Sequence, residues 1–226
     1  PRERRTTNRV SFVCSSAFRR SLGVFGVYDW RNMSERERRD AMACRKAKRR
    51  PWHAPPHYAG EGAFHVSAAC YEHSAVIGTS PQRMAEFERE LLNTLGGVCD
   101  EVYAWCVLPN HYHVLADTRD FRAVSAAIGH LHGRLSFQWN GQDQSQGRKV
   151  WHRSTDRRIR SDRHFWATMN YVHHNAVHHG YASRWEDWPF SSAREFLLAT
   201  GRAEAIRLWK AYPILDYGKG WDEANM

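Results

Sequence analysis

Residues 108–115 read Leu-Pro-Asn-His-Tyr-His-Val-Leu, and this stretch decides how the chain is interpreted. Side chains alternate between the two faces of a strand, so an extended backbone here points His111 and His113 to the same face. Two imidazoles side by side on a sheet face can hold one divalent metal ion. Pro109 and Asn110 lie between the apolar run 102–108 and the run that begins at His111, which predicts an antiparallel hairpin.

A second pair, His130 and His132, has the same spacing and needs a different interpretation. The chain has fourteen histidines, so one such pair is expected by chance. His130 and His132 lie in a predicted helix, where residues two apart point in widely different directions and cannot share a metal ion. We therefore take His111 and His113 as the candidate ligands, against the alternative of two hydrogen-bonded strand histidines.

A predicted helix over 161–179 supplies the next candidates, Tyr171 and Asn175. Residues four apart lie on one face of a helix. If that face covers the histidine pair, a metal ion, an amide ligand and a phenolic nucleophile share one site, which suits cleavage of a phosphodiester. A tyrosine in such a helix is more often a core residue. His174 and His178 have the spacing of helical zinc ligands but lack the accompanying carboxylate motif.

The positive charge is concentrated at the N-terminal end. The formal net charge is +9. Residues 1–50 carry fifteen Lys and Arg against five Asp and Glu, a net charge of +10, while residues 51–226 are close to neutral. Such a charge predicts an anionic partner. A capping-box pattern at Ser34 opens a predicted helix to Arg50, which is either a solvated charged helix or a phosphate-contacting one.

The composition fits one globular domain with attachments in a reducing compartment. Of the 226 residues, 42% are hydrophobic. Five cysteines without a Cys-x-x-Cys motif argue against a disulfide framework and for the cytosol. No apolar run is long enough for a membrane span. We divide the chain into a basic arm and helix (1–57), a main domain (58–200) and a C-terminal tail (201–226).

The order of predicted elements indicates the fold class. Strands are expected over 64–70, 102–108, 111–116 and 150–155, and helices over 80–95, 120–139 and 161–179. This order of strands and helices, with a hairpin between the first two helices, predicts an α+β fold in which helices pack on an antiparallel sheet.

Four linked segments resemble the REP-associated tyrosine transposases, a branch of the single-tyrosine HUH transposases. Residues 104–113 resemble the strand pair that carries the family's Pro-Asn-His-x-His, and 150–153 resemble its next strand. Residues 171–180 resemble the nucleophile helix, with Ala176 where the family usually has proline, and 186–192 resemble the Trp-Pro-x-Ser-Ser segment that follows. The basic residues 1–50 have no counterpart that we can align.

The resemblance implies a ferredoxin-like antiparallel sheet of four to five strands and a DNA-nicking and strand-transfer activity. It implies that His111, His113 and Asn175 bind Mg²⁺ or Mn²⁺ and that Tyr171 forms a 5′-phosphotyrosine. The implied partner is single-stranded or hairpin DNA resembling repetitive extragenic palindromes. The protein itself is expected in the cytoplasm, associated with the nucleoid. The relatives include monomers and dimers, so a homodimer stays open, as do the target sequence and the general base.

Basic residues that we expect to contact DNA fall in two groups. The first group lies on the N-terminal helix and the second leads into the nucleophile helix: Arg45, Lys46, Lys48, Arg49 and Arg50, then Arg148, Lys149, Arg153, Arg157 and Arg158. The alternative is that these side chains are simply solvated.

Two other functions compete with the nicking enzyme. One is a domesticated protein that binds hairpin DNA without cutting it, and the other is a metal-dependent hydrolase of small phosphoesters. The intact set of His111, His113, Tyr171 and Asn175 argues against pure binding. The charge of the N-terminal arm argues against a small substrate.

Overall fold

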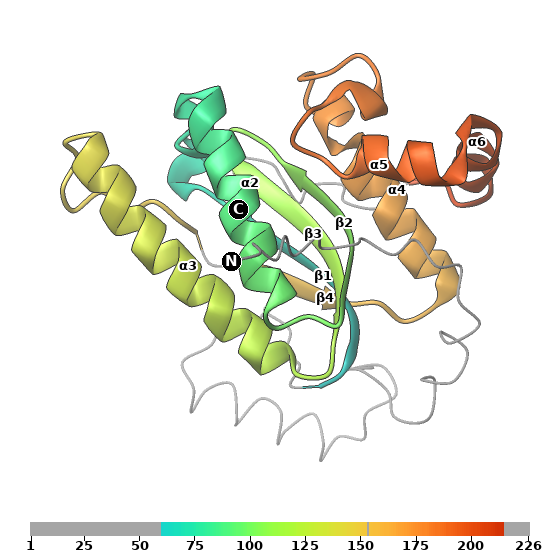
Figure 1. The fold of residues 1–226 in the computed structure, drawn as a ribbon, viewed down its shortest axis with the longest axis horizontal. Helices are drawn as coiled ribbons and strands as arrows, with labels where there is room; N and C mark the ends of the chain where they lie inside the picture. Colours follow the sequence, from blue (N-terminus) through green and yellow to red (C-terminus); the bar gives the residue numbers. More distant parts are fainter. Residues whose placement is uncertain (1–59, 153, 215–226) are drawn as a thin grey trace, which may run out of the picture. The chain divides into compact units, whose positions relative to one another are not determined.

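The structure is a computed structural model that describes residues 60–152 and 154–214. Its centre is an antiparallel sheet in the order β2-β3-β1-β4 (Figure 1). The strands are β1 (Gly62–Ala69), β2 (Glu101–Val107), β3 (His111–Thr118) and β4 (Thr155–Arg158). The expected α+β fold with a four-stranded antiparallel sheet is therefore confirmed.

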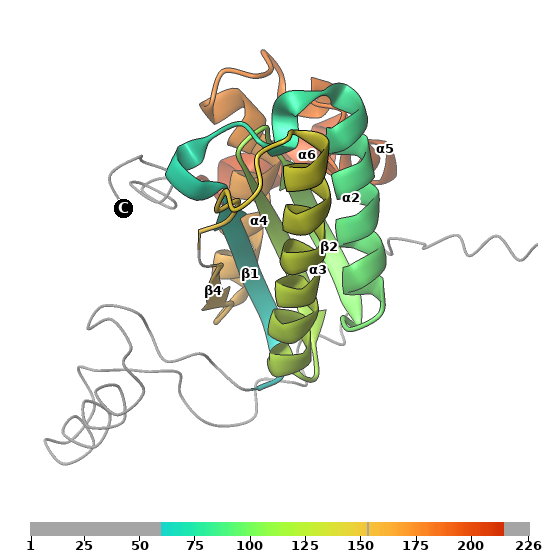
Figure 2. The same ribbon diagram turned by 90° about the vertical axis from the view of Figure 1, so that its left-hand side faces the viewer.

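Helices pack on both faces of the sheet (Figure 2). One face carries α2 (Pro81–Gly96) and α3 (Phe121–Gln142), and the other carries α4 (Asp162–His178), α5 (Ala193–Thr200) and α6 (Arg202–Ala211). Short 3₁₀ turns, η2 (Tyr71–His73), η3 (Ile77–Thr79) and η4 (Trp185–Asp187), join the elements. Among the strands, α4 packs mainly on β2 and β3, so it covers one half of its face of the sheet.

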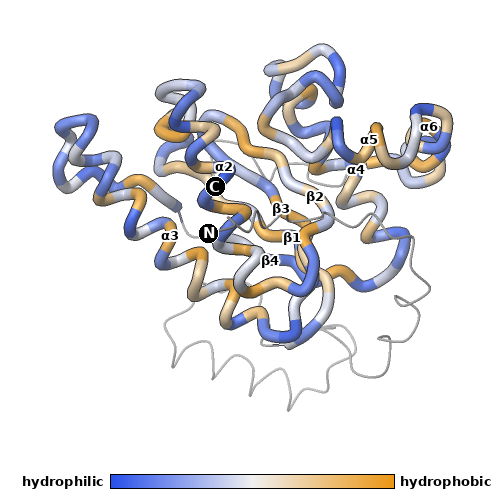
Figure 3. The backbone as a smooth tube through the Cα atoms, in the orientation of Figure 1, coloured by the Kyte–Doolittle hydropathy of each residue, from blue (hydrophilic) through white to orange (hydrophobic). Residues whose placement is uncertain are grey.

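Local sequence explains where α2 begins and which side it buries. Ser80 is the N-cap, and its hydroxyl accepts a hydrogen bond from the Arg83 amide, while Pro81 occupies the first turn. Apolar side chains at helical spacing then face the sheet: Met84, Phe87, Leu91 and Leu95. The same division between an apolar inner side and a polar outer side is visible along α2 and α3 (Figure 3).

The fourth strand differs from its prediction. The sequence favoured 150–155, whereas β4 spans Thr155–Arg158 and Trp151 forms only an isolated bridge with Cys70. Trp151 is buried in the core beside Phe87 and Trp139, which explains its apolar signal. All four residues of β4 are polar and this strand lies at the sheet edge, so no apolar alternation marks it.

The two histidines of α3 point in opposite directions, as predicted. His130 is exposed, while His132 is buried, stacks on Trp151 with ring centroids 4.0 Å apart and hydrogen-bonds the Tyr112 hydroxyl at 3.1 Å. This burial lowers the pKa of His132 to about 4. His132 is therefore neutral and part of the α2–α3 core at neutral pH.

The buried His132 should make stability fall with acidity. The unfolded chain protonates this residue below pH 6.5 but the folded chain only near its lowered pKa, so stability is lost as pH falls between these values. We expect this one group to reduce the free energy of unfolding by about 2 kcal/mol between pH 7 and pH 5. Urea unfolding of the wild type and of His132→Phe tests this. The variant should show the weaker pH dependence, and parallel curves would contradict the assignment.

The segment 188–192 pairs with the outer edge of β2 and explains the Trp-Pro-x-Ser-Ser pattern. The Val107 amide donates to the Phe190 carbonyl at 2.8 Å, and the Ser192 amide donates to the Trp105 carbonyl at 3.1 Å. The Trp188 indole also donates to the Val107 carbonyl. This segment therefore covers an edge that would otherwise present open backbone groups.

Helix α6 lies inside the segment that the sequence set apart as a tail. Ala205 and Leu208 are buried with Phe196 of α5 and Val172 of α4 in one apolar cluster. Helices α5 and α6 meet at Gly201, whose φ of 82° is a backbone angle that favours glycine. The predicted boundary after residue 200 therefore falls between two helices that pack together.

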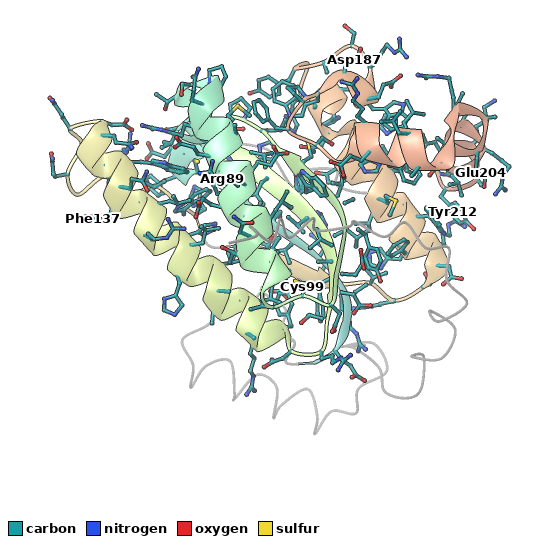
Figure 4. All side chains as sticks on the ribbon, viewed as in Figure 1. Arg89, Cys99, Phe137, Asp187, Glu204 and Tyr212 are labelled. Carbon is teal, nitrogen blue, oxygen red and sulfur yellow. The ribbon has the colours of Figure 1, made fainter. Side chains whose placement is uncertain are left out.

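Large apolar side chains of the described residues are mostly buried; the exposed ones are Phe137, Leu198, Ile206 and Tyr181. Phe137 projects from the outer side of α3 and is 87% exposed (Figure 4). None of the helices in the described part of the chain is long and apolar enough to cross a membrane.

Candidate active site

The two histidines of β3 lie side by side under α4. His111 and His113 share the face of the sheet that carries Leu115, which packs with Val172 of α4. Their ring centroids are 5.2 Å apart and the ring planes are nearly perpendicular. Both residues are buried. The alternation predicted for this strand is therefore what points both imidazoles into one site.

Helix α4 brings Asn175 and Tyr171 to these histidines. The Asn175 Oδ1 atom lies 3.1 Å from His111 Nε2, and the Tyr171 ring lies 5.1 Å from the His113 ring, centroid to centroid. Asn175 and Tyr171 are four residues apart on the buried side of the helix, which runs without interruption through Ala176. The structure thus brings together all four residues predicted to form the site, each between 0% and 4% exposed.

Asn110 fixes the orientation of the His111 ring. The Asn110 Nδ2 group donates to the His73 carbonyl at 3.1 Å, so its Oδ1 faces His111 Nδ1 at 2.8 Å. An amide oxygen only accepts, so His111 Nδ1 carries a proton, and in the neutral imidazole the lone pair is then on Nε2. That lone pair points at Asn175, the other predicted ligand.

His65 of β1 plays the corresponding part for His113. The His65 Nε2 atom is 3.1 Å from His113 Nδ1, and the His65 ring also meets the Tyr171 ring edge-on at 5.8 Å. Histidines that bind metals commonly donate their other ring N–H to such a neighbour, which fixes their orientation. The sequence analysis missed His65. Its signal was a polar residue inside the alternating strand 64–70. Only the pairing of β1 with β3, which puts His65 opposite Leu115, brings it diagonally next to His113.

The side chains present fit a divalent metal ion. His111 and His113 would offer ring nitrogens and Asn175 an amide oxygen, a mixed set of nitrogen and oxygen ligands. With the Asn175 amide in its present orientation, its oxygen faces the His111 lone pair, and its buried Nδ2 has no hydrogen-bond partner within the described residues. Two acceptors facing each other suit a cation between them. The described residues hold no group of three or more His, Cys, Asp or Glu side chains arranged for a metal.

The turn that carries Asn110 packs closely against Gly78 of η3. The Gly78 amide donates to the Pro109 carbonyl at 2.8 Å. A Cβ atom added to Gly78 would lie 2.3 Å from Pro109 Cβ and 2.7 Å from Pro109 Cα. The glycine is required for this close approach and not for its backbone angles, since its φ is −83°.

We expect Gly78→Ala to destabilise the protein by about 1–3 kcal/mol, because the added methyl group overlaps backbone atoms of the turn. Gly133→Ala is the matched control. Nothing lies within 4 Å of its added Cβ, and alanine is favoured in a helix interior. Thermal or urea unfolding of both variants checks this. Equal free energies of unfolding for the two variants would show that the turn can move away from the added methyl group without loss of stability.

Ser192 ties α4 to β2 behind the site. Its hydroxyl accepts from the Trp105 amide at 3.0 Å and is 3.0 Å from Nε2 of the fully buried His173. Burial lowers the pKa of His173 to about 3, so this ring is neutral. The contact fixes the helix that carries Tyr171 and gives the serine pair of residues 191–192 a structural role.

The remaining histidines of α4 do not form a zinc site of their own. His174 is half-buried and bonds the Asn170 carbonyl at 3.0 Å, and His178 is exposed. The ring of His179, at the end of the helix, lies 4.7 Å from the ring of His111. His179 thus borders the main site.

The basic residues predicted to contact DNA have different surroundings. Arg148 is paired with Asp143 at 2.7 Å, so it has a structural role. Lys149 is exposed and lies over the Tyr71 ring at 4.3 Å, and Arg157 is exposed on the edge strand β4, next to the half-buried Arg158. The remaining predicted residues lie outside the described part of the chain: Arg45, Lys46, Lys48, Arg49, Arg50 and Arg153.

A pocket of about 600 Å³ lies elsewhere, between η4 and α5. Two arginines on its wall, Arg184 and Arg202, are paired with the buried carboxylate of Glu186. These arginines lower the pKa of Glu186 to about 2 against the effect of its burial. Arg184 and Arg202 therefore have a structural role at this pocket.

Comparison with known proteins bears on the fold. A solved structure of a REP-associated tyrosine transposase bound to a REP hairpin is similar, with a TM-score of 0.51 and 18% sequence identity. The match covers 63% of this chain and 83% of that chain. No family model and no curated protein matches the sequence. The chain therefore has the fold of this transposase.

Proposed function

We propose that this protein nicks single-stranded or hairpin DNA and transfers the cut strand through a covalent bond to Tyr171. The observation that carries the proposal is the meeting of Tyr171, His111, His113 and Asn175 in one buried site. Support comes from the solved transposase of the same fold, which is bound to a REP hairpin. Hairpin DNA resembling such palindromes is the proposed partner.

In the proposed reaction the Tyr171 phenolate attacks the scissile phosphorus. The bond from phosphorus to the tyrosine oxygen forms as the bond to the 3′ oxygen breaks, which leaves a 5′-phosphotyrosine and a free 3′-OH. The phosphodiester energy is conserved in the new bond, so a second 3′-OH can reverse the step and join a different strand. Strand transfer then needs no external energy source.

The surrounding side chains supply order and charge. Mg²⁺ or Mn²⁺ held by His111, His113 and Asn175 would neutralise charge on the phosphate oxygens. Asn110 and His65 hold the two imidazoles in position. The Tyr171 phenol must lose its proton in this step, and the proton passes to water, to the substrate or to a neighbouring ring.

Two alternatives stay open to test. A hairpin-binding protein that no longer cuts would keep the fold and its basic residues but gain nothing from the buried site. A hydrolase of small phosphoesters would use the metal site without needing Tyr171 or a basic surface.

The direct test mixes the protein with labelled hairpin and single-stranded oligonucleotides in Mg²⁺ or Mn²⁺ and resolves the products on a denaturing gel. A labelled band that migrates with the protein and requires metal supports the proposed enzyme. Tight, salt-sensitive binding without that band would replace it with the non-cleaving protein. Hydrolysis of p-nitrophenyl phosphodiesters with neither result would favour the small-substrate hydrolase.

A further inference from the structure

A cluster of rings and one cation lies at the end of β1, next to the candidate active site. The Tyr71 and His152 rings are 4.9 Å apart, the His73 and His152 rings are 6.3 Å apart, and the Lys149 ammonium lies over the Tyr71 ring. The three rings are half-buried and Lys149 is exposed. We call these four residues the aromatic cluster.

Hydrogen bonds connect the aromatic cluster to the turn that positions His111. The Cys70 amide donates to the Asn110 carbonyl at 2.7 Å, and the Asn110 side chain donates to the His73 carbonyl. The other side of Asn110 orients the His111 ring. One asparagine therefore contacts both the aromatic cluster and the candidate metal ligand.

The backbone of the aromatic cluster is strained. Glu72 and His73 have φ values of 55° and 52°, in the left-handed region that is unfavourable for residues other than glycine. The loop is held there by the bond to Asn110 and by the Glu72 amide, which donates to His152 Nε2 at 3.2 Å. Strain of this kind is typical of loops that present side chains to a ligand.

The aromatic cluster also borders β1 and β4, the half of the sheet on which α4 packs least. His152 follows Trp151, which points into the α2–α3 core, so His152 lies on the opposite side, where α4 packs. On that side β4 adds the exposed side chains of Thr155 and Arg157. Lys149 and Arg157 give this border a positive charge.

We propose that the aromatic cluster stacks an unpaired nucleobase of the DNA strand that reaches Tyr171, while Lys149 contacts its phosphate. Flat rings beside a cation are the chemistry by which proteins hold single-stranded DNA, since every base has a face that stacks. The inference rests on the proposed function and adds to it a subsite for the single-stranded flank of a hairpin.

The test uses the full chain and two labelled hairpins, one blunt and one with a single-stranded flank that carries 2-aminopurine at successive positions. Stacking quenches 2-aminopurine, so the wild type should reduce its fluorescence at one flank position. Tyr71→Leu should restore that fluorescence and weaken binding of the flanked hairpin by about 5- to 100-fold, with the blunt hairpin unchanged.

Matched variants separate stacking from folding. Tyr71→Phe keeps the ring and should behave as the wild type, and Tyr181→Leu removes an exposed tyrosine elsewhere. Lys149→Gln should weaken binding of the flanked hairpin. It should also reduce the salt dependence of that binding by about the amount that one phosphate contact contributes.

The outcomes distinguish the two proposals. If the wild type binds and cuts the flanked hairpin but Tyr71→Leu matches it in affinity and quenching, the nucleobase subsite is wrong and the proposed function stands. If the wild type binds neither hairpin and forms no adduct with either, both proposals fail.

Discussion

Tyr171→Phe is expected to abolish the covalent protein–DNA adduct, with the rate of strand cleavage falling by about 1,000-fold or more, because no other group can take the place of the nucleophile. Hairpin affinity should stay within about threefold of the wild type. The variant loses one hydroxyl group and keeps the ring that packs against His65 and His113. Its stability should therefore change by about 1 kcal/mol or less.

Tyr181→Phe is the matched control for this prediction. Tyr181 lies just beyond α4 and is 43% exposed, so removing its hydroxyl should leave the adduct unchanged. Cleavage on a denaturing gel and hairpin binding by fluorescence anisotropy are measured for both variants. An adduct that persists in Tyr171→Phe would mean that another residue is the nucleophile, and the proposed mechanism would have to be abandoned.

The sequence predicted the parts of the fold that depend on local pattern. The helix capped by Ser80 and the strand that carries His111 and His113 follow from spacing along the chain, since each element has its own period. The position of β4 did not follow, because its four polar residues at the sheet edge have no apolar pattern. Helices α5 and α6 were also missed, although their buried residues complete the core over α4.

The candidate site divides in the same way. Periodicity put His111 with His113 and Tyr171 with Asn175, and the structure joins the two pairs. The residues that orient them could not be found in this way. His65 comes from a strand whose register with β3 depends on the whole sheet, and the contacts of Asn110 depend on a turn. Long-range contacts of this kind have no signature in a single sequence.

Removal of the metal ligands is the second large effect that we expect. His111→Ala should reduce cleavage by about 100-fold or more and weaken the binding of Mn²⁺ to the protein, because the amide and one imidazole hold an ion much less well than the full set. Excess EDTA should stop cleavage by the wild type to a similar extent. His130→Ala is the control. This histidine is exposed on α3 and lies two residues from His132, the same spacing as between His111 and His113.

The readout that decides this prediction is Mn²⁺ binding, followed by the electron paramagnetic resonance of the free ion, in the presence and absence of hairpin DNA. The binding measurement is independent of catalysis, so it separates a lost ligand from a distorted active site. Asn175→Ala should act in the same direction as His111→Ala, because its Oδ1 atom is 3.1 Å from His111 Nε2. If both variants bind Mn²⁺ as the wild type does while cleavage is lost, His111 and Asn175 contact the phosphate themselves and the ion lies elsewhere.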